Sequence, residues 1–166
     1  VICDPGMLRT LSDREFRAGL AEVVKAAIIA DADLFARIEA TTFDDLRSDT
    51  DLLTDAVSAS IRVKADIVER DERESGDRRK LNLGHTLAHA IEKCTNRLNH
   101  GEAVAVGTAL IADASVKLGV LTAEDRDRIA GVLKKLGFDL TPPVDVKRLL
   151  KEVGKDKKSE DGMLRI

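Results

Sequence analysis

The sequence predicts an all-α domain of about seven helices, with short strands at the two chain ends. Apolar residues recur at intervals of three and four along much of the 166-residue chain, which is the spacing of one face of an α-helix. Aromatic residues are scarce, with four Phe and no Tyr or Trp, so the core must be built from Leu, Ile, Val and Ala, which suit packed helices. The length fits one compact domain over residues 1–166.

Three helices are expected in the first part of the chain, over residues 13–30, 32–40 and 50–69. The first has the clearest signal, because Ser12 and Glu15 have the spacing of a capping box ahead of an apolar pattern of helical period. Gly19 lies inside this helix at a cost of about 1 kcal/mol relative to Ala, which indicates close packing or the close approach of a ligand. A charged turn at residues 71–77 follows the third helix and is too polar for a core.

Four more helices are expected in the second part, over residues 80–93, 101–118, 122–137 and 145–153. The second of these is rich in Ala, Val and Gly and should be buried. Gly137 ends the third, and the Pro142-Pro143 pair separates it from the last. Residues 1–5 and 163–166 have the composition of strands. Because the chain starts without Met and stops at the strand-like residues 163–166, we expect it to be a piece of a longer polypeptide.

Composition argues against several classes of partner. The formal net charge of −3 is spread evenly, with no basic block that could follow a phosphate backbone, so no nucleic acid is expected to bind. The chain has no apolar run of about twenty residues for a membrane span and no signal segment, so no membrane association is expected. The two cysteines, Cys3 and Cys94, lack a metal-binding spacing, which fits a reducing, cytoplasmic compartment.

All three histidines, His85, His89 and His100, fall within sixteen residues. Histidine is the commonest metal donor and titrates near neutral pH, so this grouping predicts a metal or proton-transfer site, with chance clustering on a solvated helix as the alternative. Spacing alone favours His85 and His89 as the chelating pair, since they lie one turn apart on a helix. Zinc proteases with this spacing carry a Glu after the first His as general base, whereas this chain has Thr86. A protease therefore lacks its general base here.

Charged and polar residues interrupt apolar stretches elsewhere. Glu22 and Lys25 lie in an otherwise apolar part of the first helix, Lys64 interrupts the third, and Asn82 precedes His85 by three residues. Burying such groups without partners is costly, so they could face one cleft that binds a metal together with an anionic substrate. The alternative for each lysine taken singly is a surface ion pair, or a side chain whose stem lies on the core while its ammonium reaches solvent.

These residues belong to motifs that resemble the C-terminal domain of the 3-dehydroquinate synthase family. The matching segments keep the family's order and approximate spacing over essentially the whole chain: LSDRE (11–15), AGLAEVVK (18–25), KADIV (64–68), DERE (71–74), LNLGHTLAHAIE (81–92), HGEAV (100–104) and DKK (156–158). The resemblance implies a zinc ion, or another divalent metal, held by Glu22, His85 and His100. His89 would then serve the substrate or a proton transfer, which replaces the chelating pair suggested by spacing.

The resemblance also implies a substrate site and a reaction. The residues matching positions that line the family's substrate site are Lys25, Lys64, Glu74, Arg78, Asn82 and one of Lys157 and Lys158. The implied substrate is an anionic sugar phosphate, 3-deoxy-D-arabino-heptulosonate 7-phosphate, converted to 3-dehydroquinate with loss of phosphate in the shikimate pathway of aromatic amino-acid biosynthesis. Related sugar-phosphate cyclases share the zinc ligands and differ in substrate, so a sister cyclase is an alternative.

The family's reaction also uses NAD. The sequence contains no Gly-rich phosphate loop after a strand, so NAD is expected to bind mainly to an N-terminal dinucleotide-binding domain of the same polypeptide. This chain alone is therefore expected to be inactive, and a homodimer is compatible with the resemblance. A non-catalytic helical interaction module with structural histidines remains the alternative from a different class.

Overall fold

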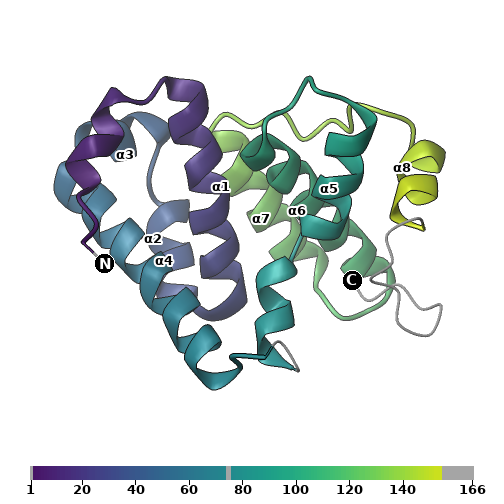
Figure 1. The fold of residues 1–166 in the computed structure, drawn as a ribbon, viewed down its shortest axis with the longest axis horizontal. Coiled ribbons are helices and arrows are strands. Elements are labelled where there is room, and N and C mark those ends of the chain that lie inside the picture. Colours follow the sequence, from purple (N-terminus) through teal and green to yellow (C-terminus); the bar gives the residue numbers. More distant parts are fainter. Residues whose placement is uncertain (1, 74–75, 155–166) are drawn as a thin grey trace.

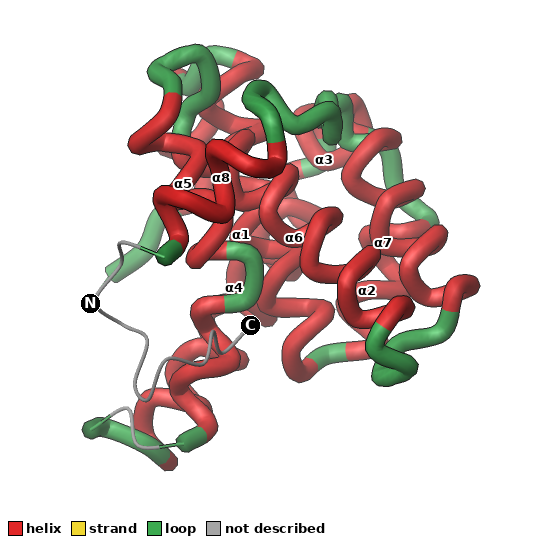
Figure 2. The backbone as a smooth tube through the Cα atoms, turned by 90° about the vertical axis from the view of Figure 1, so that its right-hand side faces the viewer, coloured by secondary structure: helices red, strands yellow, loops and turns green. Residues whose placement is uncertain are grey.

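The computed structural model describes residues 2–73 and 76–154, and every regular element in these residues is a helix (Figure 2). In chain order the elements are η1 (Pro5–Thr10), α1 (Asp13–Ala30), α2 (Ala32–Glu39), α3 (Phe43–Ser48), α4 (Thr50–Arg70), η2 (Asp77–Asn82), α5 (His85–Cys94), α6 (His100–Lys117), α7 (Ala123–Lys135) and α8 (Val146–Val153). The all-α prediction is confirmed, and each of the seven predicted helices has a counterpart.

The structure differs from the sequence-based prediction in three elements. The prediction of a strand at residues 1–5 is wrong, because residues 2–4 have no regular structure. A 3-10 helix, η1, follows, with Pro5 as its first residue and Asp4 as its N-cap. The strand expected at residues 163–166 lies outside the described part of the chain. Helix α3 was not predicted; it begins at a capping box formed by Thr42 and Asp45.

The third difference concerns the histidine helix, which begins at His85 and not near residue 80. Residues 77–82 form η2, a separate 3-10 helix, and Gly84 then takes a left-handed conformation with φ of 75° as the N-cap of α5. Glycine adopts this conformation without the steric cost that a Cβ would add. The break places His85 at the first position of α5, so its side chain lies at a helix end.

Helix α6 is the centre of the packing. It contacts α1, α5 and α7, and most of its residues from Gly101 to Ala112 are buried (Figure 1). Small residues permit this close approach: a Cβ at Gly101 would overlap the backbone of Ala18 in α1, and one at Gly107 would overlap the carbonyl of Gly84. The prediction that this small-residue helix is buried is confirmed.

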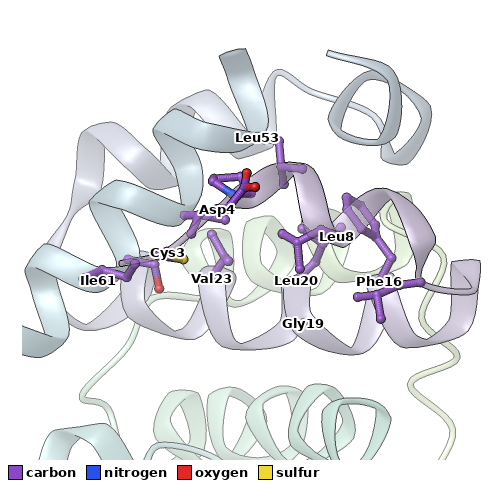
Figure 3. Close-up of a pocket in the computed structure, with 13 residues that line it drawn as sticks. Cys3, Asp4, Leu8, Phe16, Gly19, Leu20, Val23, Leu53 and Ile61 are labelled. Carbon is purple, nitrogen blue, oxygen red and sulfur yellow. The ribbon is translucent and has the colours of Figure 1, made fainter. Parts of the chain in front are cut away.

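An apolar hollow of about 270 Å³ lies between the N-terminal segment, α1 and α4 (Figure 3). Leu8, Leu20, Val23 and Leu53 are among the side chains that line it. Gly19 also lies on its wall, and a Cβ there would meet no atom within 4 Å. The inference of close packing at Gly19 is therefore wrong.

Candidate metal centre

Three side chains from three different helices converge at one point. Glu22 comes from the middle of α1, His85 is the first residue of α5, and His100 is the first residue of α6. Each offers one donor atom, and the three atoms lie within 4.8 Å of one another. Nε2 of His85 lies 3.4 Å from Glu22 Oε1, and Nε2 of His100 lies 3.7 Å from the same oxygen. Glu22 lies 63 positions before His85 and 78 positions before His100 in the sequence. The packing of α6 against α1 and α5 brings their helices together (Figure 1).

The partners of the two imidazoles determine which ring nitrogens face Glu22. Nδ1 of His85 lies 3.1 Å from the carbonyl oxygen of Leu83, and Nδ1 of His100 lies 3.2 Å from Oε1 of Glu92. A carbonyl and a carboxylate only accept hydrogen bonds, so Nδ1 is the nitrogen that carries the proton in each neutral ring. Each Nε2 then presents a lone pair toward Glu22, which is the arrangement that a metal ligand needs.

The two oxygens of Glu22 have different surroundings. Oε2 lies 2.6 Å from Nζ of Lys25, whose side chain is only 8% exposed. Oε1 is shielded from solvent and has no hydrogen-bond partner among the described residues. Burial would raise the pKa of this carboxyl, but its contacts with the protonated form of the His85 ring and with Lys25 outweigh that effect and lower the pKa to about 2. The carboxylate is therefore ionised at neutral pH.

The donor set fits a divalent metal ion. Catalytic zinc sites use three protein ligands drawn from His and carboxylate and leave a further position for water or substrate. Here two imidazole lone pairs and a carboxylate oxygen without a partner face one another, which is unfavourable unless a cation lies between them. The residues present thus match zinc in number and in chemistry.

The position of His100 depends on how α6 begins. Asn99 and Glu102 form a capping box at the N-terminus of α6. The guanidinium of Arg14, in α1, donates to both carboxylate oxygens of Glu102 at 2.8 and 2.6 Å, and also to the carbonyl of Arg97. These contacts connect the first turn of α6 to the helix that carries Glu22.

His89 lies beside the three converging residues. Its ring centroid is 5.8 Å from that of His85 and 6.3 Å from that of His100. It is one helical turn beyond His85 on α5, and its ring is partly buried. This places an additional imidazole at the edge of the centre, beside the rings of the two other histidines.

The other predicted substrate residues are arranged around η2. Lys64 is exposed on α4, Asn82 is the exposed last residue of η2, and η2 packs against both α4 and α1. Arg78 donates from its backbone to Asp71 and from its guanidinium to the carbonyl of Glu72. Their roles remain predictions. Glu74, Lys157 and Lys158 lie outside the described residues.

Sequence reasoning did not single out Arg14, Glu92 or Glu102. A signal for Glu92 was present, because His85, His89 and Glu92 have the i, i+4, i+7 spacing of one helix face. Asn99 and Glu102 likewise have capping-box spacing. The contact between Arg14 and Glu102, 88 residues apart, has no local signature in the sequence.

Comparisons with known proteins place these observations in a family. Residues 19–159 match the family model described as 3-dehydroquinate synthase C-terminal. The 3-dehydroquinate synthase of Nitrosospira multiformis is 45% identical over 168 residues, covering 99% of this chain and 46% of the relative. That of Microcystis aeruginosa is 42% identical over 172 residues, covering 99% of this chain and 46% of the relative.

Two solved structures of other synthases have a similar fold. The 2-epi-5-epi-valiolone synthase of Streptomyces hygroscopicus subsp. jinggangensis 5008, with NAD+ and Zn2+ bound, matches with a TM-score of 0.84 and 27% identity over 96% of this chain and 45% of its own. A 2-deoxy-scyllo-inosose synthase complexed with carbaglucose-6-phosphate, NAD+ and Co2+ matches with a TM-score of 0.78 and 25% identity, over 94% of this chain and 44% of its own.

The chain spans about half the length of the curated relatives that it matches. Across residues 2–73 and 76–154, no helix is long and apolar enough to cross a membrane. The family model covers most of the chain, so the resemblance seen in the sequence motifs is confirmed. This chain belongs to the 3-dehydroquinate synthase family and corresponds to its C-terminal domain.

Proposed function

We propose that this domain holds a divalent metal, most favourably zinc, through Glu22, His85 and His100. The observation that carries the proposal is the buried Oε1 of Glu22, which has no hydrogen-bond partner among the described residues and is faced by Nε2 of both histidines. Support also comes from two structural neighbours that bind Zn2+ or Co2+.

We propose further that the domain is the metal- and substrate-binding part of a 3-dehydroquinate synthase. The reaction would convert 3-deoxy-D-arabino-heptulosonate 7-phosphate to 3-dehydroquinate and phosphate. The 42–45% identity to synthases of this name supports this assignment over a sister cyclase, since the sister cyclases match at 25–27%. When bound, the metal supplies Lewis-acid chemistry that eases the oxidation of a substrate hydroxyl by NAD.

The remaining residues would bind and orient the substrate. Lys64 and Arg78 would neutralise its carboxylate and phosphate, and Asn82 would hydrogen-bond an oxygen without adding charge. Lys25, which is paired with Glu22, would line the site beside the metal. The imidazole of His89, next to the metal ligands, would accept a proton from the substrate or donate one to it. Glu74, Lys157 and Lys158 are assigned to this site by resemblance alone.

NAD would bind mainly to an N-terminal dinucleotide-binding domain. Both structural neighbours have NAD+ bound and are about twice the length of the matched region. This chain's sequence lacks a Gly-rich phosphate loop after a strand. The isolated chain would therefore bind metal without turning over substrate, and a cytoplasmic location belongs to the same proposal.

The test of the metal site is zinc quantification on the purified chain. The wild-type chain should hold about one zinc per chain that a chelator removes, and Glu22→Ala and His100→Ala should reduce this to a small fraction. Glu124→Ala, in the first turn of α7, is the control and should retain the wild-type content. Unchanged zinc in both ligand variants would overturn the site, and a wild-type chain without stoichiometric zinc would favour a helical interaction module.

The test of the reaction uses the full-length gene product. Incubation with 3-deoxy-D-arabino-heptulosonate 7-phosphate and NAD should release phosphate and form 3-dehydroquinate, identified by mass spectrometry. Formation of a different cyclitol from another sugar phosphate, with this substrate untouched, would assign the protein to a sister cyclase.

A further inference from the structure

The carboxylate of Glu92 contacts the imidazole of His100 on the side of the ring away from Glu22. Glu92 lies in the last turn of α5, and its Oε1 is 3.2 Å from Nδ1 of His100. The donor atoms that converge on the centre come from Glu22, His85 and His100, so Glu92 is outside the ligand set. Its contact with the centre is through the imidazole of His100.

The ring of His100 is less restrained by its surroundings than the ring of His85. The side chain of His100 is 49% exposed, against 16% for His85. An exposed imidazole on the first residue of a helix can rotate about its side-chain bonds and exchange between two tautomers. His85, by comparison, is packed and its Nδ1 faces the main-chain carbonyl of Leu83.

We propose that Glu92 is a positioning residue for the metal centre, an inference that rests on the proposed function. Its carboxylate accepts a hydrogen bond from Nδ1–H of His100. This contact fixes the orientation of the ring and keeps the proton on Nδ1, so that the lone pair of Nε2 faces Glu22.

The chemistry of residue 92 allows a graded test. A glutamine at this position keeps an oxygen that accepts the Nδ1–H bond and removes the charge, whereas an alanine removes the acceptor altogether. If orientation is the role of Glu92, Glu92→Gln should behave nearly as the wild-type chain, and Glu92→Ala should not. If the position matters only through its negative charge, the two variants should be equally impaired.

The first measurement is made on the metal-free chain. Nitrogen-15 NMR of the histidine rings, recorded over a series of rising pH until the ring signals no longer change, identifies which nitrogen of His100 carries the proton. The wild-type chain and Glu92→Gln should show the Nδ1–H form, and Glu92→Ala should show a mixture of both tautomers. A wild-type ring protonated on Nε2 would overturn the proposal whether or not metal binds.

The second measurement is the zinc dissociation constant from competition with a chelator. Glu92→Ala should weaken zinc binding by about 10- to 100-fold, and Glu92→Gln by much less. In the His100→Ala background, Glu92→Ala should cause no further loss, because the residue acts through that ring. Glu124→Ala, on another helix, is the matched control, and circular dichroism verifies that each variant remains helical.

The outcomes separate this inference from the proposed function. A wild-type chain that binds no zinc would overturn both. Wild-type affinity in Glu92→Ala, or an equal loss in the His100→Ala background, would overturn the role of Glu92 and leave the three-residue metal site in place.

Discussion

At the scale of single residues, the two carboxylate oxygens of Glu22 have different partners, and one of them faces both imidazoles. Lys25 holds Oε2 at 2.6 Å, which leaves Oε1 as the oxygen that faces the two imidazoles. The lysine is almost completely buried, as expected for a cation in an apolar helix only when it has a partner. The same ion pair explains why two charged residues are tolerated in the apolar stretch of α1.

The open space beside Gly19 leads to a stability prediction. Because a Cβ at this helical position meets no atom within 4 Å, Gly19→Ala should gain helix propensity without a clash. We expect the free energy of unfolding of the chain to rise by about 0.5–1 kcal/mol, measured by urea denaturation. A decrease would show that the hollow is occupied or that α1 moves.

Residue patterns identified the chemistry of the centre but not its geometry. Helical spacing favoured His85 with His89, whereas the structure brings His85 together with His100 and Glu22. The pairing depends on the loop between α5 and α6 and on the contact of α6 with α1, which local periodicity does not encode. The match of motifs to a family supplied the information that spacing lacked.

At the scale of helices, the crossing of α1 and α6 controls the distance between Glu22 and His100. Gly101 lies against the backbone of Ala18, so Gly101→Ala should push the first turn of α6 away from α1. We expect a loss of about 1–3 kcal/mol in the free energy of unfolding and weaker zinc binding. Calorimetry and chelator competition measure the two effects.

The matched control for that variant is Gly131→Ala in α7, where a Cβ would meet open space. It should be neutral or stabilising and should leave zinc affinity unchanged. If Gly101→Ala behaved in the same way, the close approach of α1 and α6 would not be what sets the ligand distance.

An ion pair between α2 and α7 leads to a pH prediction. Two hydrogen bonds from Arg128, at 2.9 and 2.8 Å, lower the pKa of Glu39 below its usual 4.5. The stabilisation is therefore present above about pH 4.5 and is lost as the pH falls toward the lowered value. Glu39→Gln should be less stable at neutral pH, and its free energy of unfolding should fall less steeply on acidification.

Urea denaturation at a series of pH values measures that slope. Glu124→Gln, an exposed carboxylate at the start of α7, serves as the comparison and should follow the wild-type profile. A Glu39→Gln profile parallel to that of the wild type would show that solvent screens the pair completely.

The helices were predictable where a long apolar period coincided with a cap, and less so elsewhere. Helix α1 was predicted from its capping box and periodicity with the bounds that the structure has. Helix α3 was missed because it has six residues and buries one side chain, Leu46, too few for a period to show. The start of α5 was missed because the left-handed conformation of Gly84 depends on contact with α6.

At the scale of the whole molecule, the candidate centre connects three helices that belong to one core. Glu22 on α1, His85 on α5 and His100 on α6 come from three different helices, so a bound cation would act as a cross-link between them in the folded state. The all-α fold class followed from composition and periodicity, whereas the juxtaposition of these helices required tertiary packing.

A ligand that binds only the folded chain raises its stability by mass action. The midpoint of thermal unfolding should therefore rise with zinc, corresponding to about 2.7 kcal/mol at a free concentration of 100 times Kd. Glu22→Gln should abolish the increase, and a chelator should reverse it in the wild-type chain. A zinc-dependent shift that persists in Glu22→Gln would place the binding elsewhere.

The hydrogen bond from His85 to the carbonyl of Leu83 has a consequence for how the centre can be altered. A main-chain acceptor stays in place when the side chain of its residue is replaced, whereas the acceptor for His100 belongs to a side chain. The acceptor for His85 is therefore kept when the side chain at position 83 is replaced, whereas the acceptor for His100 changes with the side chain at position 92. Substitutions at position 92 would let metal affinity be tuned in steps while all three ligands are kept.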